Sequence, residues 1–189
     1  MLKGASMRVN AKGFTLVEMV IVIVIMAIAV TGITASLFPL GRQSVEQIAA
    51  VKAAELGRAV MDEVVGRNFD EKSGPYGGLP ECIPKTIADA ESCTLPNQLG
   101  ADGEPTKSAY NDVDDFHGLS GLATDVLDNT LSAGYNGYYI DIQVFYEQDS
   151  SGTMLGQVSN VATNYKRINV VITDRQGNKY PFATTRGNF

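Results

Sequence analysis

The chain has 189 residues, of which 44% are hydrophobic and 19% are charged, and its formal net charge is −6. Typical soluble globular proteins contain about 25% charged residues, and the apolar residues here gather in residues 14–40, which hold a single charge. This pattern excludes a fully soluble globule, a disordered chain and a multi-span transporter. The acidic balance also argues against a nucleic-acid partner, which needs a broad basic face.

The apolar run at residues 14–40 predicts a membrane-spanning helix. At 1.5 Å per residue it extends about 40 Å, which exceeds a bilayer core of about 30 Å. Lys3, Arg8 and Lys12 precede the run without an acidic neighbour, so the N-terminus is expected in the cytoplasm and the remainder across the membrane. The run is longer than the core of a secretory signal, roughly 7–15 residues, and Glu18 is costly within it.

Residues 12–18, with the sequence KGFTLVE, resemble the processing site of type IV prepilins and pseudopilins. The resemblance implies that a prepilin peptidase cuts after Gly13 and that Phe14 becomes the N-methylated first residue of the mature chain. The leader is then residues 1–13, or a shorter segment if translation starts at Met7. Glu18 takes the fifth mature position, where the family keeps a glutamate.

Cleavage at this site leaves an ammonium group at Phe14 and a carboxylate at Glu18 inside an apolar helix. Where helices of neighbouring subunits pack side by side, Glu18 of one subunit can neutralise Phe14 of the next, so that two costly buried charges become one pair. We therefore expect Glu18 to act in assembly with other pilin or pseudopilin subunits of the inner membrane. An ordinary signal anchor with a stray glutamate is the alternative.

The helical pattern continues beyond the apolar run. Residues 44–67 contain no proline, and their apolar residues recur in steps of three, four or seven, as in an amphipathic helix. The expected apolar face consists of Val45, Ile48, Ala49, Leu56, Ala59, Val60 and Val64. We therefore predict one helix over residues 14–67, whose first part (14–40) belongs to the membrane or filament core. Its second part (41–67) is expected to pack on a sheet.

Glycine and proline punctuate residues 68–121, which predicts a loop-rich segment. The only two cysteines, Cys82 and Cys93, lie there, on the side expected to be the periplasm. An even number of cysteines in an oxidising compartment favours one disulfide. A metal site at this pair is disfavoured because the single histidine, His117, is distant in sequence.

Residues 110–118, with the sequence YNDVDDFHG, contain Asp112, Asp114 and Asp115. Their carboxylates are suitable ligands for calcium, although the spacing matches no EF-hand loop. One alternative is an acidic surface loop whose aspartates cap turns. Another is acid–base chemistry with His117, but no nucleophile motif such as Gly-x-Ser-x-Gly accompanies it. We expect no catalytic residue, no cofactor other than calcium, and no enzymatic activity.

Beyond residue 137 the apolar period changes to two, which predicts strands at 138–146, 167–173 and 180–185 and a hairpin turn at 174–178. The predicted fold is therefore α+β and pilin-like, with a long N-terminal helix packed on a small antiparallel β-sheet. The globular domain is expected over residues 68–189. This order of elements is also the architecture of the pilin family.

More weakly, residues 68–71, the cysteine pair and residues 112–118 resemble the D-type minor pilin-like proteins of the mannose-sensitive haemagglutinin (MSHA) pilus system. This resemblance implies a structural subunit that acts in pilus assembly or surface attachment. A minor pseudopilin of a type II secretion system is the alternative. A membrane-anchored periplasmic enzyme and a glycan-binding tip are less favoured.

Overall fold

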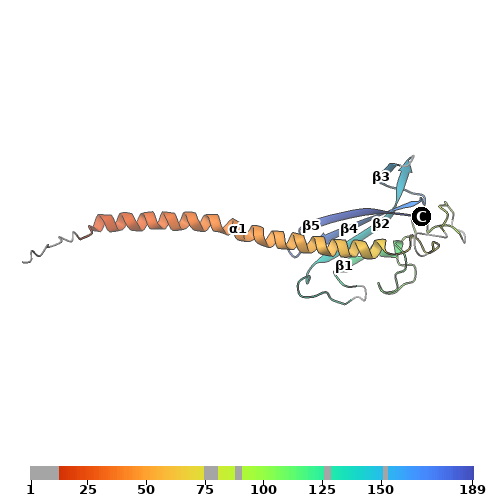
Figure 1. The fold of residues 1–189 in the computed structure, drawn as a ribbon, viewed down its shortest axis with the longest axis horizontal. Helices are drawn as coiled ribbons and strands as arrows, with labels where there is room; N and C mark the ends of the chain where they lie inside the picture. The colour runs from red at the N-terminus through yellow and green to blue at the C-terminus, as the bar shows by residue number, and fades with distance from the viewer. Residues whose placement is uncertain (1–12, 75–80, 88–90, 126–128, 151–152) are drawn as a thin grey trace, which may run out of the picture. The chain divides into compact units, whose positions relative to one another are not determined.

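The computed structural model describes residues 13–74, 81–87, 91–125, 129–150 and 153–189. The chain divides into two compact units, Met1–Gln47 and Ile48–Phe189. A single α-helix, α1 (Leu16–Val65), contributes to both units (Figure 1). This confirms the predicted long N-terminal helix. The predicted leader lies outside the described residues, except for Gly13.

In the first unit, α1 is long and apolar enough over Leu16–Leu37 to cross a membrane, and none of this segment is buried within the chain. A core helix of a soluble protein would instead be mostly covered. The hydroxyl groups in this segment bond to helix carbonyls four residues earlier, from Thr31 to Ala27, Thr34 to Val30 and Ser36 to Gly32. These polar groups are therefore satisfied inside the helix, as hydrocarbon surroundings require.

The second unit contains an antiparallel sheet in the order β1-β2-β4-β5 (Figure 1). Its strands are β1 (Ser120–Leu122), β2 (Tyr139–Ser150), β4 (Tyr165–Thr173) and β5 (Lys179–Gly187), and β3 (Thr153–Val158) pairs with the far end of β2. The three predicted strands correspond to β2, β4 and β5. The sequence did not predict β1 or β3, because three residues are too few to show a period and β3 lacks apolar alternation.

The turn between β4 and β5 forms as predicted. Asp174 accepts hydrogen bonds from the backbone N–H groups of Gln176 and Asn178, at 2.8 and 2.9 Å. Gly177 has a φ of +86°, which a side chain would disfavour. Together these features close the hairpin and fix the register of β5 against β4.

The second part of α1 packs on one face of the sheet. The helix contributes Ala53, Leu56, Val60 and Val64, and the sheet contributes Ile140, Ile142, Val144, Ile168, Val170 and Ile172. These sheet residues alternate along β2 and β4, so the period-two prediction is confirmed. The α+β fold, with a long helix on a small antiparallel sheet, is therefore established.

The predicted apolar face of the helix is only partly correct. Val45, Ile48 and Ala59 are exposed, whereas Ala53, which was not predicted, is completely buried. The sheet covers a narrow stripe with three- and four-residue steps, so apolar residues beside that stripe stay outside the core. Gly57 also faces the sheet, because the ring of Phe182 on β5 packs directly against it.

The segment between the helix and the sheet is loop-rich, as predicted. Its described residues contain isolated bridges, such as Asn68 with Asp112, and then the short 3-10 helix η1 (Asp114–Phe116). Phe116 of η1 is fully buried in the helix–sheet core. The loop is thereby anchored on the main core at its C-terminal end.

Candidate functional site

The predicted processing segment lies just before α1. Gly13, Phe14 and Thr15 are outside the helix, and Phe14 is 77% exposed. The hydroxyl of Thr15 accepts the backbone N–H of Glu18 at 3.3 Å, so Thr15 caps the helix. Threonine followed three residues later by glutamate is the sequence signature of a capping box. This capping contact was not predicted from the sequence, although the Thr-x-x-Glu spacing is visible at residues 15–18 of the processing motif.

The three aspartates of the acidic segment are buried, at 2–3% exposure. Oδ1 of Asp112 accepts the N–H groups of Asp114 and Asp115, and Oδ2 of Asp115 accepts those of Asn111 and Asp112. The turn-capping interpretation is therefore right, but the surface location expected with it is wrong. Binding of calcium by these aspartates stays a prediction, and the ion would compete with the bonds that shape η1.

His117 ties this segment to the sheet. Its Nδ1 accepts the backbone N–H of Val144 on β2, at 3.1 Å. Acceptance of this bond requires that Nδ1 carry no proton, so the ring nitrogen nearest the sheet is occupied in a structural contact. The geometry gives His117 a positioning role in the fold.

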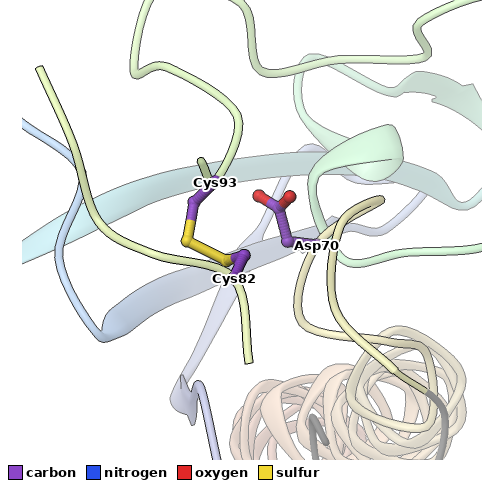
Figure 2. A group of neighbouring side chains, drawn as sticks. All are labelled: Asp70, Cys82 and Cys93. Carbon is purple, nitrogen blue, oxygen red and sulfur yellow. A yellow bond between two sulfur atoms is a disulfide. The ribbon is translucent and has the colours of Figure 1, made fainter. Parts of the chain in front are cut away.

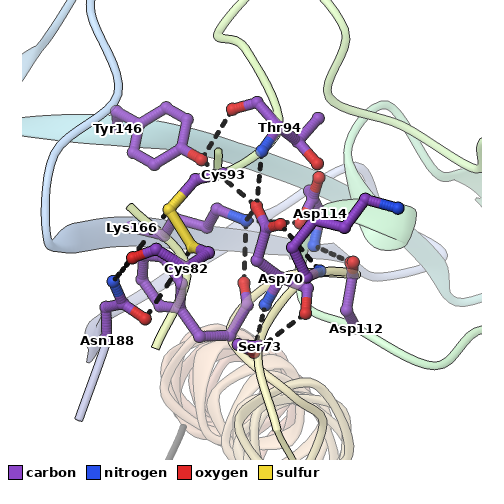
Figure 3. Close-up of polar contacts among 12 residues, drawn as sticks. Asp70, Ser73, Cys82, Cys93, Thr94, Asp112, Asp114, Tyr146, Lys166 and Asn188 are labelled. Carbon is purple, nitrogen blue, oxygen red and sulfur yellow. Dashed lines mark hydrogen bonds and ion pairs between the residues drawn. A yellow bond between two sulfur atoms is a disulfide. The ribbon is translucent and has the colours of Figure 1, made fainter. Parts of the chain in front are cut away.

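A buried lysine lies between the acidic segment and the loop after α1. Lys166 on β4 is fully buried, and its Nζ donates to the Phe69 carbonyl at 2.7 Å and to Asp70 Oδ2 at 2.9 Å (Figure 3). It also bonds directly to Asp114 Oδ1. The rings of Phe69 and Tyr146 lie over the ammonium group, with centroids 4.6 and 5.2 Å from Nζ.

Sequence reasoning missed this cluster, which we call the Lys166 cluster and define as Lys166, Asp70, Asp112, Asp114 and Tyr146. A usable signal existed. Lys166 is in phase with Ile168, Val170 and Ile172, the apolar face of the predicted strand, so the alternation places a lysine on a buried face. A lysine in such a position needs partners.

The charges of the Lys166 cluster are set by burial and by mutual attraction. Burial raises the pKa of Asp70, but the Lys166 ammonium and two backbone N–H donors outweigh it and hold that pKa below its ordinary value. Burial lowers the pKa of Lys166, but the Asp114 and Asp70 carboxylates outweigh this and raise it. Burial and the neighbouring Asp114 carboxylate raise the pKa of Asp112 to about 9. Asp112 is therefore protonated at neutral pH.

Cys82 and Cys93 form a disulfide in the structure. They share a small second core with Phe69, Tyr146 and Ala162, and Asp70 lies beside them (Figure 2). The two sulfur atoms and an Asp70 oxygen lie within 4.8 Å of one another, a separation that would suit the ligands of one metal ion. Because both sulfurs are already joined in the disulfide, neither is a thiolate available to a metal.

A second acidic group lies near the surface. Carboxylate oxygens of Glu71, Asp102 and Glu104 lie within 4.8 Å of one another. Partial burial and the carboxylates of Asp115 and Asp102 raise the pKa of Glu104 to about 7. One Glu104 oxygen bonds to the side-chain amide of Asn111, at 2.9 Å, whereas the other has no partner among the described residues.

Comparison with protein families finds one match. Residues 8–34 match the family model described as the prokaryotic N-terminal methylation motif. No curated protein and no solved structure matches the chain.

The matched residues include Gly13, Phe14 and Glu18 and most of the apolar span. The match supports a subunit of the type IV pilin or pseudopilin class, anchored by the N-terminal part of α1. Such subunits are processed by prepilin peptidase and assemble with other pilins.

Proposed function

We propose that this chain is a minor pilin-like structural subunit of a type IV pilus of the MSHA kind, which acts in pilus assembly or surface attachment. The observation that carries the proposal is the methylation motif at residues 8–34, together with the apolar helical segment Leu16–Leu37 that it overlaps, none of which is buried by the described residues. A helix of this kind needs a membrane or neighbouring helices around it. The periplasm is the proposed location of the second unit, where an oxidising environment favours the Cys82–Cys93 disulfide.

The proposed processing step is cleavage after Gly13 and N-methylation of Phe14. Both residues lie outside α1 and are exposed, so the bond between them is accessible to a peptidase without unwinding of the helix. The test is the N-terminal sequence and intact mass of the membrane-extracted protein, with and without prepilin peptidase. We expect methylated Phe14 as the first residue only when the peptidase is present. A chain that keeps its leader beside an active peptidase would refute the proposal.

The proposed role of Glu18 is to neutralise the Phe14 amine of a neighbouring subunit. The capping contact with Thr15 offers a second explanation for the same glutamate, and two variants separate them. Glutamine supports a capping box as glutamate does, but carries no charge. We expect both Glu18→Gln and Glu18→Ala to be processed and to be depleted from purified filaments. Normal incorporation of Glu18→Gln with loss of Glu18→Ala would assign the residue to helix capping instead.

The alternative function is a minor pseudopilin of a type II secretion system, which uses the same subunit design. Deletion of the chain separates the two functions. Loss of surface pili with normal secretion of exoproteins is the expected result. The opposite phenotype would identify a pseudopilin.

A further inference from the structure

Lys166 and Asp114 are placed as a reacting pair. Nζ of Lys166 is in direct contact with Oδ1 of Asp114, although the two residues are 52 positions apart in the sequence. Lys166 extends from β4 and Asp114 opens η1, so the fold itself holds the amine against the carboxyl group (Figure 3). Groups held in contact at a fixed orientation react with effective molarities that reach about 10⁵–10⁸ M.

Water is excluded from this pair. The Lys166 side chain is completely buried and that of Asp114 is 4% exposed. The rings of Phe69 and Tyr146 cover the ammonium group, and the Cys82–Cys93 disulfide belongs to the same small core. Because amide formation releases water, a site without bulk water favours the amide and protects it from hydrolysis.

We propose that Lys166 and Asp114 condense to an intramolecular isopeptide bond, which joins β4 covalently to the η1 turn. A bond forms between Nζ of Lys166 and Cγ of Asp114, and one bond between Cγ and a carboxylate oxygen breaks. Two of the three ammonium protons leave with that oxygen as water, and the third stays on the amide nitrogen. The ammonium and the carboxylate together become one neutral amide and one water molecule. The step needs no oxidant, reductant or second substrate.

Two neighbouring carboxyl groups are placed to move the protons. Proton transfer within the pair, from Nζ to the Asp114 oxygen that it contacts, gives the neutral amine and acid that react. Asp70 lies 2.9 Å from Nζ, on the amine side, and can take the next proton once the C–N bond has formed and the nitrogen has become strongly acidic. Asp112 hydrogen-bonds to Asp114 and carries a proton at neutral pH, so it can donate to the leaving oxygen. After the protons are redistributed, both residues return to their starting states.

Asp114, not Asp70, is the acceptor. The Asp70 carboxylate is already held by the N–H groups of Lys72 and Thr94 and by the Tyr146 hydroxyl, all of which stabilise its negative charge. Such a carboxylate resists attack by a nucleophile. The carboxylate of Asp114 instead adjoins a protonated acid, which draws electron density from its carbon.

The charge of the Lys166 cluster also favours the reaction. Before it, the ammonium of Lys166 and the carboxylates of Asp70 and Asp114 are buried together, with Asp112 neutral. Afterwards only the charge of Asp70 remains, and it keeps its other donors. The net charge is unchanged, while two buried ions have disappeared. Each buried ion carries a desolvation penalty, so their removal is favourable.

The test uses the full-length chain extracted from membranes, reduced, denatured and cleaved after glutamate. The Glu104–Pro105 bond resists cleavage because proline follows the glutamate, and no other glutamate lies between residues 92 and 146 or beyond residue 147. Asp114 therefore falls in fragment 92–147 and Lys166 in fragment 148–189. We expect the two fragments to be joined, with a mass equal to their sum less one water molecule. Tandem mass spectrometry should place the link between Lys166 and Asp114.

Two variants sharpen the test. Lys166→Arg keeps the positive charge but forms no amide here, so its fragments should separate at full mass. Asp114→Asn should release ammonia in place of water and give a joined species of the same mass as the wild type. If either variant fails to accumulate, the wild-type fragments decide the question. Separate wild-type fragments of full mass, or a link from Lys166 to the fragment that contains Asp70, would overturn the proposal.

Discussion

Replacement of Gly57 by alanine tests how the helix packs on the sheet. A β-carbon at this position would lie 2.3–2.6 Å from three carbon atoms of the Phe182 ring, whereas carbon atoms pack best at about 3.5–4.0 Å. The ring belongs to a strand and is half-buried, so it has to move away from the helix and lose contact. Overpacking of this kind costs typically 1–3 kcal/mol.

Helix propensity acts in the opposite direction. In an unobstructed helix, alanine is more favourable than glycine by about 1 kcal/mol. We therefore expect Gly57→Ala to lower the free energy of unfolding of the second unit by about 1–2 kcal/mol. In a Phe182→Ala background the ring is absent, and the same change should raise this free energy by about 1 kcal/mol. The sign of the effect should reverse between the two backgrounds.

The assay is urea unfolding of the full-length chain in detergent micelles, followed by the near-ultraviolet circular dichroism of its tyrosines. Ala59→Gly is the matched control, because Ala59 is exposed on the same helix. It should lower the free energy of unfolding by about 1 kcal/mol and thereby calibrate the propensity effect. If Gly57→Ala is stabilising in both backgrounds, the ring does not rest on the helix and the reasoning fails.

Three further predictions concern the second unit. Because the folded-state pKa of Glu104, about 7, exceeds its ordinary value of 4.5, its contribution to stability is present below about pH 4.5 and is lost as the pH rises to about 7. At about pH 8 the free energy of unfolding of Glu104→Gln should therefore exceed that of the wild type by about 1 kcal/mol, after allowance for solvent screening. At about pH 4 the two proteins should unfold at the same urea concentration, and an equal gain at both pH values would contradict this. Replacement of both Cys82 and Cys93 by serine should lower the free energy of unfolding by roughly 3 kcal/mol, and an unchanged urea midpoint would show that the disulfide adds no stability. If calcium binds Asp112, Asp114 and Asp115, added calcium should raise the melting temperature and a chelator should reverse the rise, whereas equal temperatures would exclude the ion at this site.

The sequence alone determined the features that local patterns encode. Residues 14–40 hold a nearly unbroken apolar run that is long enough to cross a bilayer and follows a basic segment, so the membrane-type helix was predicted directly. The three main strands followed from alternation, because one face of each had to meet the core. The motif around Gly13 and Glu18 was equally visible, since its residues are contiguous.

Only the tertiary structure decided which distant residues meet. The alternation places Lys166 on a buried face, but its partners are decided only when β4 pairs in the sheet and Asp70 and Asp114 approach it from two separate segments. Likewise, the sequence is compatible with Asp112, Asp114 and Asp115 in a solvated loop. In the structure η1 packs against β2, and burial raises the pKa of Asp112 so that it stays protonated. Local periodicity specifies which face of an element is covered. It cannot specify what covers that face, because a contact between residues 52 positions apart depends on the closure of the whole loop between them.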